Sequence, residues 1–232
     1  MIKEIRGDIA AFINAYKGQD LIFYFGCAYI ILTYLRPHVI YPQLNFLPWT
    51  QLTILGGLGL MAFKGQLRFT GTHALVFLFA ILAGISALNS YYPDISIKNI
   101  DIPFIWAIEA LFLSNCVSNL KQLKLLMALL FLVLFKMSFF GAEVWTLRGF
   151  GFAGWGIQGP PGYFQNSGEF SLLMAMTAVM SIPFLIGLGL KRRYLWLLPI
   201  TAVMTVLGAN SRGGQLALVI GLLYLLIVYK KI

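Results

Sequence analysis

The sequence predicts an all-α protein, a polytopic bundle of transmembrane helices with the N-terminus and the C-terminus in the cytoplasm. Apolar residues make up 59% of the chain and charged residues only 11%, and the mean hydropathy is +0.83. Too few polar side chains are present to cover a water-soluble globule. The apolar residues also fall into separate runs, many of them close to the ~20 residues that a helix needs to cross a bilayer.

The runs predict about eight spans, and short loops between them favour one transmembrane domain over residues 20–232. The expected spans are 20–36, 46–63, 72–90, 102–118, 122–141, 168–190, 194–209 and 213–230. Residues 1–19 precede this domain and place Ile9, Phe12 and Ile13 at helical spacing between charged positions. We expect them to form an amphipathic helix that lies on the cytoplasmic surface of the membrane.

The distribution of basic residues orients the bundle. Most of the 17 lysines and arginines fall in alternate loops or at the termini, whereas the opposite loops hold only Arg36, Lys98, Arg148 and Arg212. By the positive-inside rule the basic loops are cytoplasmic. The net charge of +9 is thereby explained by topology, so nucleic-acid binding is not needed to account for it.

The longest outer loop, residues 142–167, is rich in glycine and aromatic residues, among them Tyr163. Such a loop can shape a groove for lipid and sugar, or it can simply anchor the bundle at the headgroups. At its end, Asn166 and Glu169 have the spacing of a capping box for the sixth span. Glu169 is alternatively a general base for an acceptor hydroxyl.

Arg212 stands on the first turn of the last span, after Asn210 and Ser211 and before two glycines. Free backbone N–H groups and the positive end of a helix dipole make this position suited to phosphate. Close approach of a ligand or another backbone is possible at Gly213 and Gly214. The alternative is an arginine that extends to lipid headgroups without any substrate.

Arg36 and Arg148 are further outer cations, and guanidinium groups that converge can grip a diphosphate. Each alone is equally suited to anchoring at headgroups. His38 follows Arg36 and is a candidate acid or base. Inside the membrane, Glu109 and Lys136 lie at similar depths on consecutive spans, and we expect an ion pair between them because an unpaired charge there is costly.

Cys27 and Cys116 lie in or at the end of spans and are expected to be packing residues. Neither belongs to a CxxC pair or lies near a histidine in the sequence. We therefore expect no metal site, and no motif calls for a cofactor.

Residues 210–214 (Asn-Ser-Arg-Gly-Gly), which open an apolar helix, and residues 162–169, which follow the glycine-rich loop, resemble the O-antigen ligase and O-antigen polymerase family. Residues 34–38 and 48–51 are similar to the exosortase-associated O-glycosylation ligases within that family.

The resemblance implies a metal-independent, inverting glycosyltransferase of lipopolysaccharide biosynthesis, a multi-pass protein of the bacterial inner membrane. It would move a glycan from undecaprenyl diphosphate, at the outer face, to lipid A core, a growing glycan or a glycoprotein. Arg212 would hold the diphosphate with help from Arg36 and Arg148. Glu169 and His38 would be the catalytic candidates, and Tyr163, Asn166 and Ser211 would line the substrate groove beside membrane lipid.

Members of that family carry more spans and a large outer loop with a catalytic histidine and arginine, whereas this chain ends soon after the helix of Arg212. We therefore expect an incomplete form that does not catalyse transfer alone. Two alternatives use the same features: a transporter or flippase of lipid-linked anions, and a non-catalytic subunit of an envelope-assembly complex.

Overall fold

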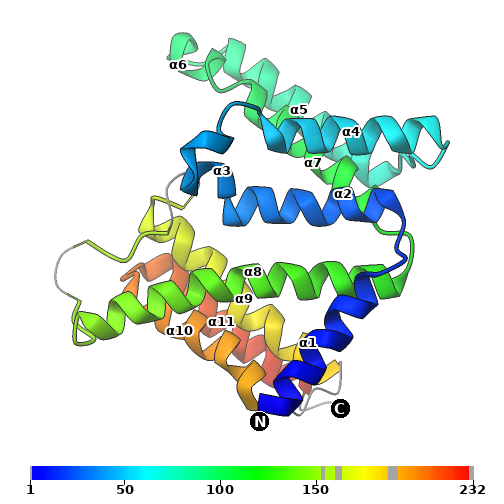
Figure 1. The fold of residues 1–232 in the computed structure, drawn as a ribbon. Coiled ribbons are helices and arrows are strands. Elements are labelled where there is room, and N and C mark those ends of the chain that lie inside the picture. Colours follow the sequence, from blue (N-terminus) through cyan, green and yellow to red (C-terminus); the bar gives the residue numbers. More distant parts are fainter. Residues whose placement is uncertain (1, 153–154, 160–163, 188–192, 230–232) are drawn as a thin grey trace. The chain divides into compact units, whose positions relative to one another are not determined.

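The structure is a computed structural model that describes residues 2–152, 155–159, 164–187 and 193–229 (Figure 1). Every regular element in these ranges is a helix. Each expected span overlaps helical structure in the described residues, and the all-α class is confirmed, whereas the number of eight membrane spans stays a prediction. Four of the helices are long and apolar enough to cross a membrane, namely α5 (Gly71–Leu88), α8 (Leu120–Leu147), α9 (Ser167–Gly187) and α11 (Arg212–Tyr229).

The chain divides into two compact units, Met1–Met127 and Ala128–Ile232, which we call unit 1 and unit 2 and describe separately. The division falls inside α8. Unit 1 also contains α1 (Ile2–Tyr16), α2 (Leu21–Ile30) with a π-helical continuation (Ile31–Leu35), α3 (Pro37–Ile40), a 3-10 turn (Pro42–Leu44), α4 (Trp49–Phe63), α6 (Pro93–Ile97) and α7 (Asp101–Asn115). Unit 2 adds a 3-10 turn (Arg193–Trp196) and α10 (Leu197–Gly208).

Within unit 1, α2 runs antiparallel to α4, and α5 runs antiparallel to α7. The start of α2 meets the end of α4 through an ion pair between Asp20 and Lys64 at 3.0 Å. The start of α5 meets the end of α7, where the His73 ring and the Ser114 hydroxyl are 2.7 Å apart. His73 also closes a capping box with Thr70 at the start of α5. This buried histidine therefore has a structural role.

The helix expected within residues 1–19 forms as α1, and Ile9 and Ile13 are exposed on it. The Tyr16 hydroxyl at its end donates to the carbonyl of Leu125 in the first turns of α8. The exposed isoleucines fit a helix that lies on a membrane surface, and the expected location of α1 on the cytoplasmic side stays a prediction.

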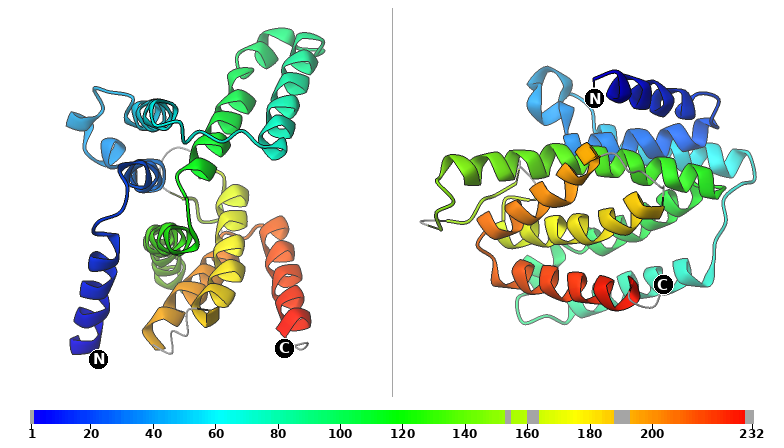
Figure 2. Two further views of the ribbon diagram at one scale, coloured as in Figure 1. Left: turned by 90° about the vertical axis from the view of Figure 1, so that its right-hand side faces the viewer. Right: turned by 90° about the horizontal axis from the view of Figure 1, so that it is seen from below.

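In unit 2, α9 packs against both α10 and α11, and Figure 2 shows the three helices side by side. Gly214 of α11 lies against Ser171 of α9, and Gly221 lies against Val179. Since residue numbers rise together along both helices, α9 and α11 run in the same direction. Small residues at these contacts allow the helix backbones to approach closely.

The fifth expected span is longer than the sequence indicated. It was expected to end at residue 141, but α8 continues to Leu147, and the connecting loop starts only after it. Gly149, with φ +63°, supplies the left-handed residue that ends the helix, and Phe150 packs on Trp145 with ring centroids 5.0 Å apart. The Phe150 N–H donates to the Trp145 carbonyl, which completes a Schellman motif.

Candidate functional site at the loop end of unit 2

Helix ends and the loop between α8 and α9 meet at one end of unit 2. Thr205 of α10 donates to the Ser138 carbonyl of α8 at 2.7 Å, and Gly208 lies against Trp145 further along. Therefore α8 and α10 run in the same direction, and both end where the loop begins. The Ile157 N–H donates to the Gly208 carbonyl at 3.3 Å, which holds the loop against the end of α10.

The starts of α9 and α11 lie at the same end. A Cβ atom added to Gly168, in the first turn of α9, would be 3.1 Å from Asn166 Oδ1 and 3.6 Å from Ser211 Oγ. We call this region, residues 148–152, 155–159, 164–169 and 208–213, the loop end of unit 2. It contains two of the three expected outer arginines, Arg148 and Arg212.

Arg212 is the first residue of α11, in the position that the sequence indicated, and its side chain is exposed. Asn210 has φ +50° and turns the chain from α10 into α11. The Ser211 hydroxyl accepts from the Gly214 N–H at 3.5 Å, and its carbonyl accepts from the Gln215 N–H at 3.0 Å. Ser211 therefore caps α11, while the Arg212 side chain extends from a helix start where the dipole is positive.

The two glycines after Arg212 differ in the space around them. A Cβ atom on Gly214 would be 1.9 Å from Ser171 Oγ, whereas a Cβ atom on Gly213 would meet nothing within 4 Å. Gly214 is therefore required for contact with α9. Gly213 leaves open space beside Arg212.

Half of the expected capping box forms at the start of α9. Asn166 Oδ1 accepts from the Gly168 N–H at 2.8 Å, and the Asn166 carbonyl accepts from the Phe170 N–H at 3.0 Å. Glu169 does not reach back: its side chain is exposed and has no hydrogen-bond partner in the described part of the chain. Its carboxylate stays open to another molecule.

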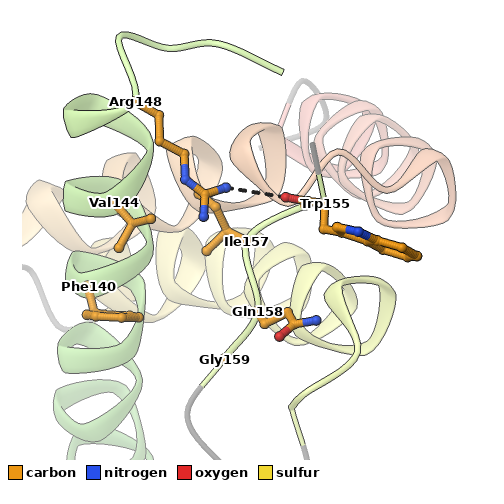
Figure 3. A pocket seen from close by; sticks show the side chains of 8 residues that line it. Phe140, Val144, Arg148, Trp155, Ile157, Gln158 and Gly159 are labelled. Carbon is orange, nitrogen blue, oxygen red and sulfur yellow. Dashed lines mark hydrogen bonds between the residues drawn. The ribbon is translucent and has the colours of Figure 1, made fainter. Parts of the chain in front are cut away.

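Arg148 lines a hollow of about 550 Å³ between α8 and the loop (Figure 3). The other lining residues are Phe140, Val144, Trp155, Gly156, Ile157, Gln158 and Gly159. Phe140, Val144 and Arg148 are four residues apart and so share one face of α8. The Arg148 Nη1 donates to the Trp155 carbonyl at 3.3 Å, and its other donors have no partner among the described residues.

Trp155 and Gln158 are lining residues that the sequence reasoning did not single out as a site. Trp155 is 90% exposed, and Figure 3 shows its ring extending away from α8. An exposed indole ring, an amide and a guanidinium together offer an apolar face and planar hydrogen-bonding groups. The signal in the sequence was the aromatic, glycine-rich loop, but the loop alone did not indicate which residues face α8.

The remaining expected site residues belong to unit 1 or lie outside the described residues. Arg36 and His38 belong to unit 1, where Arg36 has φ +48° and donates through Nε to the Thr33 carbonyl at 3.3 Å. Their convergence with Arg148 and Arg212 stays a prediction. Tyr163 lies outside the described residues, as do parts of the expected loop.

The expected partner of Glu109 was Lys136, which belongs to unit 2. That ion pair stays a prediction, and within unit 1 the partner of Glu109 is the Tyr29 hydroxyl. Cys27 and Cys116 are both buried, as expected of packing residues, and Cys116 lies against Gly26. Among the described residues, no cluster of three histidine, cysteine or acidic side chains is placed to hold a metal ion.

The four long apolar helices indicate the class of protein, a helical membrane protein. At the loop end of unit 2 it has a hollow lined by aromatic side chains and by the cationic Arg148. No family model matches the chain, and comparisons with curated proteins and with solved structures give no match either.

Proposed function

We propose that this chain is a multi-pass protein of the bacterial inner membrane that binds an undecaprenyl-diphosphate-linked glycan at its outer face. In this proposal it belongs to a glycan transferase that resembles O-antigen ligases and polymerases. All eight helical segments span the membrane, and both termini are cytoplasmic. The shorter ones, such as α4 with 15 residues, would span by local thinning of the bilayer.

The observation that carries this proposal is the presence of Arg148 and Arg212 at the same end of unit 2, with the hollow beside Arg148. Two guanidinium groups suit a diphosphate, because each can donate two parallel hydrogen bonds to phosphate oxygens. The start of α11 adds the positive end of its dipole. Trp155 and Gln158 would contact the sugar nearest the diphosphate.

Glu169 is the candidate general base in this proposal. Its exposed carboxylate would take the proton of an acceptor hydroxyl as that oxygen attacks the anomeric carbon. The bond from the anomeric carbon to the diphosphate would break, and undecaprenyl diphosphate would leave with the electron pair. The acceptor is a lipid A core, a glycan or a glycoprotein.

The proposal is tested by binding of undecaprenyl diphosphate to the full chain in nanodiscs. Arg212→Ala and Arg148→Ala should each weaken binding by about 2 kcal/mol, or about 30-fold, because each loses a charge-assisted contact. Arg212→Lys should recover only part of the affinity, since an ammonium group cannot pair in a bidentate manner. Arg193→Ala removes a cation at the other end of unit 2 and is the matched control.

Unchanged affinity in both alanine variants would remove the two arginines from the site. An equal loss in Arg193→Ala would indicate a general effect of positive charge instead of a specific site. If the arginine variants bind normally but stop movement of the lipid between the leaflets of a vesicle, the protein is a flippase and the transferase proposal is wrong.

A further inference from the structure

Unit 1 contains an ionisable residue in the middle of an apolar helix, and the outer site does not use it. Glu109 lies in α7, eight residues from the start of the helix, and is half-buried. The Tyr29 hydroxyl of α2 is its hydrogen-bond partner, and Tyr29 is only 4% exposed. Phe112, one turn further along α7, packs edge-on against the Tyr29 ring with centroids 5.7 Å apart. Glu109 therefore lies on the face of α7 that meets α2.

Among the described residues of unit 1, no cationic side chain is an interaction partner of Glu109. Tyr34, in the π-helical segment after α2, is close enough to interact electrostatically with Glu109. The neighbouring α4 has no titratable side chain, and the only one in α5, His73, is bonded to Ser114 near the far end of α7. Within unit 1, Glu109 has no ion pair among the described residues.

This arrangement tolerates both protonation states of the carboxyl group. Ionised Glu109 accepts a hydrogen bond from the Tyr29 hydroxyl, and neutral Glu109 can donate its own proton to the same phenolic oxygen. A single neutral donor compensates little of the cost of burying a charge in an apolar environment. A proton is therefore the natural ligand, because Glu109 belongs to no cluster of three histidine, cysteine or acidic side chains among the described residues that could hold a divalent cation.

The backbone beside this pair departs from regular α-helix. Directly after Tyr29 and Ile30, the chain forms a π-helix over Ile31–Leu35, which carries Tyr34, and Arg36 then adopts a left-handed conformation. Short π-helical segments are rare and occur frequently at functional sites. Here the segment begins two residues after the hydrogen-bond partner of Glu109.

We propose that Glu109, together with Tyr29 and Tyr34, forms a proton-binding site within the membrane portion of unit 1. The Glu109 carboxylate binds one proton from the aqueous phase to become a carboxylic acid, and releases it when the pH rises. This site is independent of the outer glycan site, and a failure of either leaves the other intact.

Labelling with dicyclohexylcarbodiimide tests the proposal, because this apolar reagent adds to protonated carboxyl groups in apolar surroundings. The full chain in liposomes is treated between about pH 5 and about pH 9, and labelled peptides are identified by mass spectrometry. We expect labelling at Glu109 that falls about tenfold for each pH unit above its midpoint. Glu109→Gln should lose the label, and the exposed Glu169 should take up little of the apolar reagent at any pH.

The Tyr29→Phe variant tests whether labelling at Glu109 reports a proton site formed with Tyr29 or only a carboxyl group that the reagent can reach. The hydrogen bond from Tyr29 favours the ionised form, so its loss should move the labelling midpoint to higher pH. An unchanged midpoint would contradict the assigned pair. No labelling of Glu109 at any pH would overturn the proposal. Labelling that arises only in Lys136→Gln would overturn it too, and would assign Glu109 to an ion pair with Lys136.

Discussion

Both units bring helices together at glycine, but the glycines meet different partners. In unit 2, Gly214 faces the short side chain and the backbone of Ser171. In unit 1, Gly57 of α4 faces the ring of Phe112, with the nearest ring carbon 2.3 Å from an added Cβ atom. The contact in unit 2 brings two backbones together, whereas the contact in unit 1 seats an aromatic side chain against a helix.

The two units also differ in where their polar and charged groups lie. In unit 2 the buried hydroxyls of Ser138, Thr201 and Thr205 bond to one another and to backbone carbonyls, and the charged groups of the proposed site lie at the loop end. In unit 1 a carboxyl group, Glu109, lies between helices. This difference suggests that unit 2 is a rigid support for a site at its end, and that unit 1 responds to protonation in its interior.

The largest effect is expected for Gly214→Ala. The added Cβ atom would overlap Ser171, whose backbone carbon is only 3.1 Å away, so the helices must separate. We expect a loss of about 3 kcal/mol in the free energy of unfolding, measured by SDS titration in mixed micelles. Gly213→Ala, which meets nothing, is the matched control and should change it by less than about 0.5 kcal/mol. Equal effects of the two would refute the close contact between α9 and α11.

The second-largest loss in the free energy of unfolding is expected for Gly57→Ala. Phe112 is fully buried, so its ring has limited room to move, but a ring can tilt where a backbone cannot. A loss of about 2 kcal/mol is expected in the same titration. Gly59→Ala on the same helix meets nothing within 4 Å and serves as control. A larger loss than in Gly214→Ala would reverse the comparison between the units.

A smaller effect should follow from Gly149→Ala. This residue ends α8 with φ +63°, a conformation that alanine adopts with strain. We expect about 1 kcal/mol of destabilisation and a change in Trp145 emission, because Phe150 and Phe152 pack on that ring. Unaltered stability would show that the Schellman motif does not fix the start of the loop.

The smallest effect is expected for Thr205→Val, which keeps the shape of the side chain and removes its hydroxyl. The Thr205 hydroxyl donates to the Ser138 carbonyl of α8 at 2.7 Å and to the Thr201 carbonyl within α10 at 2.8 Å. Interhelical hydrogen bonds in membranes contribute about 0.6 kcal/mol on average, and we expect a loss of that size. A loss as large as that of Gly214→Ala would mean that hydroxyl bonding, and not close packing, holds unit 2 together.

Features set by neighbours in sequence could be predicted, whereas those set by distant residues could not. Hydropathy located the helices, and local spacing indicated that Asn166 begins α9 and that α11 opens at Arg212. The contact of Gly214 with Ser171 joins segments far apart in the chain, and no local pattern encodes it. The contact of Tyr29 with Glu109 could not be predicted for the same reason, because it joins α2 and α7, which are not consecutive helices.

The central claim is that the loop end of unit 2 faces the outside of the membrane, where a diphosphate-linked glycan is available. Labelling of single cysteines with a membrane-impermeant maleimide in spheroplasts tests it most directly, because the native Cys27 and Cys116 are buried and should stay unlabelled. Trp155→Cys should react in intact spheroplasts, and Lys121→Cys, near the start of α8, should react only after permeabilisation. The reverse pattern would place the loop end in the cytoplasm and contradict the account.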